Sequence, residues 1–131
     1  MGTPKKVNYK DRLDRVFSEY IRRRDADENG YIKCISCGKR VHWKEADAGH
    51  YVNRKHMNLR WDEKNVNAQC RSCNRFDEGN MIGYTQGLVE KYGESILEKL
   101  RISRMRIFHI HDSFLKLMIE DYKKKIKELG Q

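Results

Sequence analysis

The chain has 131 residues, a formal net charge of +9, and 36% charged against 38% hydrophobic residues. This length suits one domain with a modest core, over residues 1–131. No apolar run approaches the roughly 18 residues of a membrane span, and the start lacks a secretory signal, so we expect an intracellular protein without a membrane partner. The charge favours a polyanion such as nucleic acid, although a generically basic protein would carry it too.

The first predicted helix covers residues 8–25, where apolar residues recur at the spacing of one helical face. Residues 31–33 follow as a short strand. Over the next forty residues we expect short strands and loops and no regular helix. One strand would span 45–52, and a second would contain Trp61 and Val66, because these residue types are enriched in strands.

The rest of the chain is predicted to be helical. We expect helices over 71–78, 81–92 and 94–104, and a final long helix capped by Asp112 or Ser113. The final helix has an apolar stripe made of Leu115, Met118, Ile119, Tyr122, Ile126 and Leu129. This stripe could pack against other helices of the same chain or form a homodimer interface, and the sequence does not choose between them.

Four cysteines form two pairs, Cys34 with Cys37 and Cys70 with Cys73. The two-residue spacer lets both sulfurs of a pair reach one ion, and thiolates are ligands that zinc prefers. In a reducing compartment such pairs indicate metal binding rather than disulfides. We therefore predict a structural zinc at these four residues, with an iron–sulfur cluster or a redox dithiol as the alternatives.

Three polar residues near the cysteine pairs suit phosphodiester hydrolysis. A neutral histidine can act as a general base, and a divalent cation held by oxygen ligands can neutralise a phosphate. His50 lies between the cysteine pairs and is the candidate base. Asn74, directly after Cys73, is the candidate oxygen ligand. Asn65 lies five residues before Cys70, where its amide could hydrogen-bond across the loop that carries His50.

These motifs resemble the NinG (Rap) family of phage recombination nucleases, within the HNH nucleases that carry a four-cysteine zinc. The resemblance runs from about Arg12 through the final helix. Its most specific segments are Cys34-Ile35-Ser36-Cys37-Gly38, Asp47-Ala48-Gly49-His50-Tyr51, Leu59-Arg60-Trp61, Asn65-Val66, Gln69-Cys70, Cys73-Asn74 and Gly79-Asn80. A four-cysteine zinc followed at once by an asparagine is also similar to the phage endonuclease VII junction resolvases.

The resemblance implies an α+β fold, with a treble-clef ββα-metal (HNH) core over 31–80, an N-terminal helix and a helical region over 81–131. It implies a metal-dependent endonuclease acting on branched DNA such as Holliday junctions and D-loops, encoded by a phage or prophage and acting in the host cytoplasm, with other recombination proteins as further partners. His50 would be the general base, Asn74 a ligand of catalytic Mg²⁺ or Mn²⁺, and Asn65 the central asparagine of the pattern.

The sequence departs from the HNH pattern directly before the base. Most HNH enzymes have a metal-binding aspartate there, whereas this chain has Gly49. The nearest carboxylate is Asp47, and we keep it as the second ligand of the catalytic cation, with His56 as substitute. In a straight strand the side chain of Asp47 would point away from that of His50, so this assignment requires a bulge or turn at residues 48–49.

Contacts to DNA phosphates are expected from cationic residues near the site. Such contacts position the backbone and carry no sequence information. No base-reading motif is visible, so we expect selectivity for DNA shape. The expected contact residues are Arg54, Lys55, Arg60, Arg71 and Arg75, with help from Arg22, Arg23 and Arg24 on the first helix.

Two other classes of protein fit parts of this sequence. A non-catalytic zinc-finger module that binds nucleic acid would explain the cysteines and the charge, but gives no reason for His50, Asn65 and Asn74 to occur together. A ribosome-associated zinc-ribbon protein would explain the charge and leave the segment 47–50 without a role.

Overall fold

Helix α1 (Tyr9–Arg24) is the first element of the structure, a computed structural model that describes residues 6–130. The side chain of Asn8 caps it by accepting a hydrogen bond of 3.1 Å from the backbone N–H of Asp11. Leu13, Phe17 and Ile21 are buried and lie four residues apart, on one face of the helix. The predicted N-terminal helix is confirmed.

Two small antiparallel sheets follow. Strand β1 (Tyr31–Lys33) pairs with β2 (Arg40–His42), and the turn between them carries the first cysteine pair. A 3₁₀ turn, η1 (Trp43–Glu45), leads into β3 (Ala46–His50), which pairs with β4 (Val66–Cys70). The strand predicted over 45–52 is therefore confirmed in its centre, and His50 is its last residue.

The predicted second strand, which was to contain Trp61 and Val66, is only partly correct. Trp61 is not in a strand but directly follows a short helix, α2 (Met57–Arg60), and β4 begins only at Val66. Burial explains the difference: Trp61 packs with Val66 in the core beneath α1, and Leu59 is buried in a separate cluster. The expectation that this region lacks regular helix is wrong for this one turn.

The second cysteine pair opens a single wide helical turn of the π type, η2 (Ser72–Phe76), which is shorter than the helix predicted over 71–78. The backbone leaves it through three left-handed residues in a row, Glu78, Gly79 and Asn80, with φ of 46°, 82° and 45°. This conformation cannot continue a right-handed helix, so the predicted helix ends early.

The remaining helices are α3 (Met81–Tyr92), α4 (Ser95–Arg104) and α5 (Asp112–Glu128). The bounds predicted for the first two are confirmed within one residue. The cap predicted for the last helix is off by one, since His111 occupies the N-cap position and its side chain makes no capping bond.

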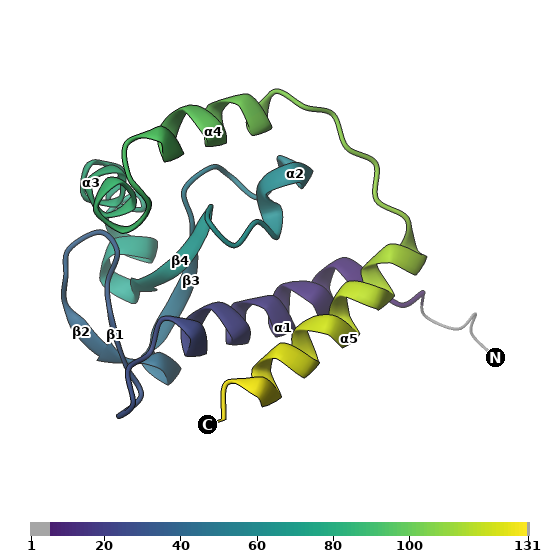
Figure 1. The fold of residues 1–131 in the computed structure, drawn as a ribbon, viewed down its shortest axis with the longest axis horizontal. Coiled ribbons are helices and arrows are strands. Elements are labelled where there is room, and N and C mark those ends of the chain that lie inside the picture. The colour runs from purple at the N-terminus through teal and green to yellow at the C-terminus, as the bar shows by residue number, and fades with distance from the viewer. Residues whose placement is uncertain (1–5, 131) are drawn as a thin grey trace.

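Helix α5 lies alongside α1 (Figure 1), and their apolar faces form the main core. Leu115, Ile119 and Tyr122 of the predicted stripe are buried there. The rings of Phe17 and Tyr122 meet edge to face, with centroids 5.0 Å apart. The stripe is thus used within the chain. A second core lies under α3 and α4, and is made of Leu59, Tyr84, Leu88, Ile96 and Leu100.

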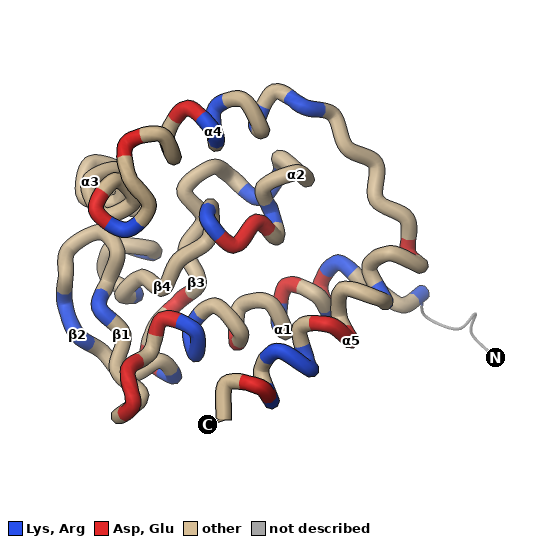
Figure 2. Tube along the Cα trace, viewed as in Figure 1, with Lys and Arg blue, Asp and Glu red and all other residues tan. Residues whose placement is uncertain are grey.

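The architecture is mixed helix and strand, as predicted from the sequence. Lysine and arginine are spread over helices and strands and alternate with acidic residues on α1, α4 and α5 (Figure 2). Each helix within residues 6–130 is too short or too polar to cross a lipid bilayer.

Candidate active site and metal centre

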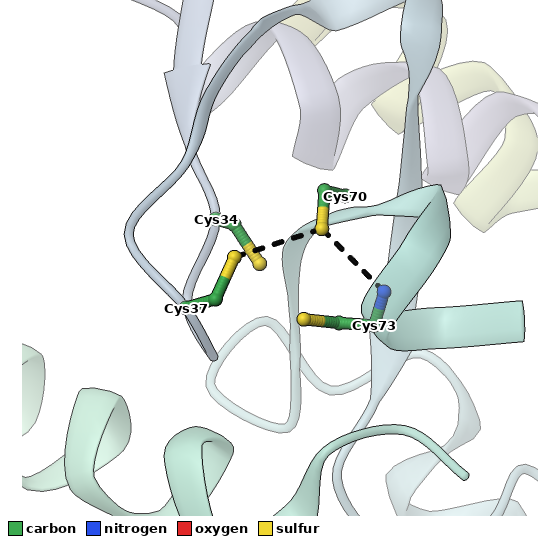
Figure 3. Close-up of side chains that lie close together, drawn as sticks. All are labelled: Cys34, Cys37, Cys70 and Cys73. Carbon is green, nitrogen blue, oxygen red and sulfur yellow. Dashed lines mark hydrogen bonds between the residues drawn. The ribbon is translucent and has the colours of Figure 1, made fainter. Parts of the chain in front are cut away.

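The four cysteine side chains converge from three segments (Figure 3). Cys34 and Cys37 come from the turn between β1 and β2, Cys70 ends β4, and Cys73 lies in η2. All four sulfurs lie within 4.8 Å of one another, and those of Cys37 and Cys70 are 3.7 Å apart. A tetrahedral zinc with bonds of about 2.3 Å holds its sulfurs about 3.8 Å apart. The four residues therefore fit a four-coordinate metal such as zinc.

Hydrogen bonds from neighbouring amides hold the segments of the four-cysteine cluster together. The Nδ2 of Asn80 donates to the sulfur of Cys73 at 3.4 Å. Gln69 is buried, and its Nε2 donates to the hydroxyl of Ser36 at 2.9 Å and to the carbonyl oxygen of Gly79 at 2.6 Å. The amide of Gln69 thus ties the turn of the first cysteine pair to the segment that follows the second.

A cavity of about 450 Å³ is lined by both principal site residues predicted from the sequence, His50 and Asn74, the second of which directly follows Cys73 of the four-cysteine cluster. They reach it from the end of β3 and from η2. The cavity is lined by Asp14, Phe17, Ser18, Ala48, His50, Asn53, Arg54, Arg60 and Asn74. We call it the His50 cavity.

The imidazole of His50 is fixed by the backbone. Its Nε2 lies 2.9 Å from the carbonyl oxygen of Arg60. A carbonyl oxygen only accepts, so in the neutral ring Nε2 carries the proton and Nδ1 is the free base. Burial lowers the pKa of His50 below its usual value, and this outweighs the hydrogen bond to Arg60 and the charge of Asp14, which raise it. The ring is therefore neutral at pH 7.

Asn65 is buried and hydrogen-bonds across the loop that follows His50. Its Oδ1 accepts from the backbone N–H of Val52 at 2.9 Å. Its Nδ2 donates to the carbonyl oxygens of Val52 and Leu59, at 3.0 and 2.9 Å. Both ends of the loop are thereby fixed to the start of β4, which holds the backbone around His50 in place.

Asn74 is oriented by a carboxylate outside the cavity. Its Nδ2 donates to Oδ2 of Asp47 at 3.0 Å, and Arg75 donates to both oxygens of that carboxylate at 2.8 and 2.9 Å. Burial raises the pKa of Asp47, but the bonds from Arg75 and Asn74 outweigh it and lower the pKa. Since Nδ2 is committed to Asp47, Oδ1 of Asn74 is the atom available to a cation.

The structure does not bring Asp47 to His50. The bulge that its role as a metal ligand required is absent, because β3 pairs with β4 residue by residue from Ala46 to His50. Side chains three residues apart on such a strand point to opposite faces, and Asp47 does not line the His50 cavity. The sequence assignment is corrected here: Asp47 orients Asn74. His56, the substitute, also lies outside the cavity lining.

Steric crowding explains why the residue before His50 is a glycine. A Cβ at Gly49 would collide with the side-chain oxygen of Gln69, which is held in place by its own hydrogen bonds. The aspartate that most HNH enzymes have at this position would not fit in this chain.

Asp14 is a residue of the cavity that the sequence analysis missed. Its oxygens accept from Nε and Nη2 of Arg60 at 3.0 and 2.5 Å, and from the indole N–H of Trp61 at 2.9 Å. These partners lie 46 and 47 residues away in sequence. On the printed sequence Asp14 looks like an ordinary polar residue of an amphipathic helix, so no local signal could have found it.

The predicted DNA-contact residues are mostly ion-paired. Arg54 and Arg60 reach Asp14, Arg75 binds Asp47, and Arg71 binds Glu45 at 3.1 Å. Only Lys55 has no ion pair within the described residues. Arg54 is the most exposed of these arginines and is held loosely, at 3.7 Å.

Two of the α1 arginines predicted to help bind DNA, Arg22 and Arg24, make hydrogen bonds within the fold. Arg24 is largely buried and donates to the carbonyl oxygens of Glu63 and Val66, at 2.7 and 3.2 Å. Arg22 donates to the carbonyl oxygen of Trp43 at 3.2 Å. The help with DNA binding expected from Arg24 is therefore wrong, because its donors are used inside the protein.

Comparison with known proteins assigns the family. A family model described as "Bacteriophage Lambda NinG protein" matches residues 3–131. The chain belongs to the NinG family. It is 33% identical to Protein ninG of Salmonella phage P22 and 31% identical to Protein ninG of Escherichia phage lambda, each over 113 residues. Both matches cover 84% of this chain and 52% of the relative.

A third NinG relative, Protein ninG of Escherichia phage 933W, is 34% identical over 90 residues, covering 66% of this chain and 41% of that protein. The chain thus spans about half the length of the curated NinG relatives it matches. No solved structure is significantly similar to it. The NinG resemblance seen in the cysteine, histidine and asparagine motifs is confirmed.

Proposed function

We propose that this chain is a metal-dependent DNA endonuclease with an HNH-type active site, selective for branched recombination intermediates such as Holliday junctions and D-loops. The observation that carries the proposal is that His50 and Asn74, predicted from separate motifs, line one cavity together with two arginines. The order of β3, β4 and η2 around a four-cysteine centre supports a treble-clef ββα-metal core. The preference for branched DNA comes from the NinG resemblance.

His50 is the general base. Its Nε2–H is held by the carbonyl oxygen of Arg60, which fixes the ring and leaves Nδ1 to take a proton from water as that water attacks phosphorus. The lowered pKa keeps Nδ1 free at neutral pH. The carbonyl oxygen also stabilises the imidazolium formed, because it accepts a hydrogen bond that strengthens when the ring is charged.

Asn74, through a bound cation, and the two arginines of the cavity stabilise the negative charge of the phosphate. The Oδ1 of Asn74, aimed by Asp47, is an oxygen ligand of the kind that Mg²⁺ and Mn²⁺ take, and such a cation would neutralise the scissile phosphate. Arg54 is 65% exposed and only loosely paired, so it can turn from Asp14 to a phosphate oxygen. Arg60 is held more firmly and positions the backbone near His50.

The four cysteines are assigned a structural zinc that keeps these elements in register. Resolving a junction requires two nicks, so a homodimer is part of the proposal. Because the chain belongs to a phage family, the proposal assigns the activity to the interior of an infected cell, with other recombination proteins as its partners.

The test compares His50→Ala and Asn74→Ala with the unmodified protein on a four-way junction, a flap, a linear duplex and a single strand, in Mg²⁺, in Mn²⁺ and with neither cation added. We expect the unmodified, zinc-loaded protein to nick branched DNA with Mg²⁺ or Mn²⁺ and not without them. Each variant should lose about 100-fold or more of the rate while keeping zinc and DNA binding. His109→Ala, a histidine exposed outside the cavity, is the matched control.

Undiminished cleavage by His50→Ala would remove the mechanism. Binding without cleavage in any cation would instead identify a non-catalytic zinc-finger module.

A further inference from the structure

A second cavity of about 440 Å³ runs between α1 and α5, and its lining is strongly basic. Four of its eight lining residues are cations and one is an acid. The lining consists of Tyr9, Arg12, Arg15, Val16, Lys116, Ile119, Glu120 and Lys123. We call it the α1–α5 groove. Figure 2 shows basic residues on both of these neighbouring helices.

Three of the four cations of this groove have no ion-pair partner within the described part of the chain. Within residues 6–130, no ion pair engages Arg12, Arg15 or Lys116, and the one acid, Glu120, is paired with Lys123 at 3.4 Å. The arginines around the His50 cavity differ, because they are paired with Asp14, Asp47 or Glu45, as described above. The α1–α5 groove therefore presents more free positive charge than the proposed active site.

The cations are spread along both helices. Arg12 and Arg15 are about one turn apart on α1, and Lys116 and Lys123 are two turns apart on α5, about 10.5 Å along its axis. The ring of Tyr9, the first residue of α1, has Lys116 of α5 at 5.0 Å and Arg12 at 5.9 Å from its centre. Charges spread over such a length fit an extended polyanion better than a single small anion.

The floor of the groove argues against a membrane surface. Its apolar members, Val16 and Ile119, are half-buried and buried, whereas a helix that binds a bilayer presents exposed apolar side chains beside its cations. No large apolar residue of the groove is strongly exposed. Charge complementarity therefore selects a nucleic-acid backbone.

Helix α1 connects this groove to the proposed active site. Asp14, Phe17 and Ser18 line the His50 cavity, whereas Arg12 and Arg15 line the groove. The two surfaces thus lie on different sides of one helix. A branched molecule offers a second duplex arm for the groove, which a linear duplex lying in the His50 cavity does not have.

We propose that the α1–α5 groove binds the phosphate backbone of a second duplex arm while the first arm occupies the His50 cavity. The inference rests on the proposed function for its DNA partner, and it gives a physical reason for selecting branched over linear DNA. Arg12, Arg15 and Lys116 carry the contact, since no acidic side chain within residues 6–130 forms an ion pair with them.

The experiment measures binding of a labelled four-way junction and of a linear duplex with the sequence of one arm, without added Mg²⁺ or Mn²⁺ and at several salt concentrations. The test variant is Arg12→Gln, Arg15→Gln and Lys116→Gln combined. The matched control, Lys99→Gln, Arg104→Gln and Lys124→Gln combined, removes the same charge from exposed residues outside every ion pair and cavity described above. Thermal unfolding and zinc content verify that both variants are folded.

We expect the test variant to bind the junction about tenfold more weakly, and the slope of log affinity against log salt to fall by roughly 2–3, because each lost phosphate contact removes about 0.9. Affinity for the linear duplex should change no more than in the control. Equal junction binding by both variants, or an equal loss on junction and linear duplex, would overturn the second-arm contact. This experiment measures binding and not cleavage. A protein that fails to cleave DNA would therefore contradict the endonuclease proposal without deciding the outcome of this test.

Discussion

The imidazole of His50 and the backbone of Arg60 form the central contact of the proposed site, with 2.9 Å between Nε2 and the carbonyl oxygen. The side chain of the same arginine donates two hydrogen bonds to the carboxylate of Asp14. Asp14 also accepts from Trp61, the next residue. One carboxylate on α1 therefore fixes the residue whose carbonyl oxygen sets the tautomer of His50, and acts as a positioning residue.

Asp14→Asn should lower the rate of cleavage and shift its pH dependence. The charge of Asp14 raises the pKa of His50 against the larger effect of burial. Removing that charge lowers the pKa further, so the acidic limb of the pH–rate profile should move to lower pH, because His50 must be neutral to act as a base. A role of Asp14 in folding alone would reduce the rate without moving the limb.

The control for this variant is Glu19→Gln, which removes a carboxylate of α1 whose ion pair within residues 6–130 is with Arg23. We expect its pH profile to match that of the unmodified protein. An acidic limb of Asp14→Asn that stays in place or moves to higher pH would contradict the coupling to His50.

Asn65→Ala should destabilise the fold by about 2–4 kcal/mol, because it leaves the partly buried backbone groups of Val52 and the buried carbonyl oxygen of Leu59 without their partner. Denaturant unfolding followed by circular dichroism measures the loss. Asn29→Ala, in an exposed turn, should cost under about 0.5 kcal/mol. Equal stability of the two variants would show that the loop after His50 does not depend on Asn65.

Gly49→Ala should cost about 1–3 kcal/mol, since the added methyl group collides with the side chain of Gln69. Shortening that neighbour relieves the collision. The cost of Gly49→Ala should therefore be smaller in a Gln69→Ala background than in the unmodified protein, as a double-mutant cycle of unfolding free energies would measure. Strictly additive costs would refute the steric explanation for glycine before His50.

Removal of the metal should unfold the region around the cysteine pairs. The segments that carry them, β1–β2 and η2, are short, and three of the cysteines, Cys34, Cys70 and Cys73, form one of the core clusters. We expect one zinc per chain by elemental analysis and a lower melting temperature after chelation, restored by added zinc. Zinc binding should weaken as the pH falls, because the cysteine thiols must lose their protons before they can coordinate the ion. A melting temperature insensitive to chelation would contradict a structural zinc.

The sequence alone determined the local features of this protein. The helix at 81–92, the strand that ends in His50 and the four-cysteine cluster were predicted correctly, because residue periodicity and metal-ligand spacing depend on neighbours along the chain. The NinG family could also be recognised from these motifs.

Tertiary structure decided which polar residues share a cavity. The pairing of Asp14 with Arg60 joins residues 46 positions apart, and the regular β3–β4 ladder turns Asp47 away from His50. Arg24 looked like a DNA contact and is an internal hydrogen-bond donor. The common reason is that the partner of a charged side chain depends on how α1 packs against the strands, which no local pattern encodes.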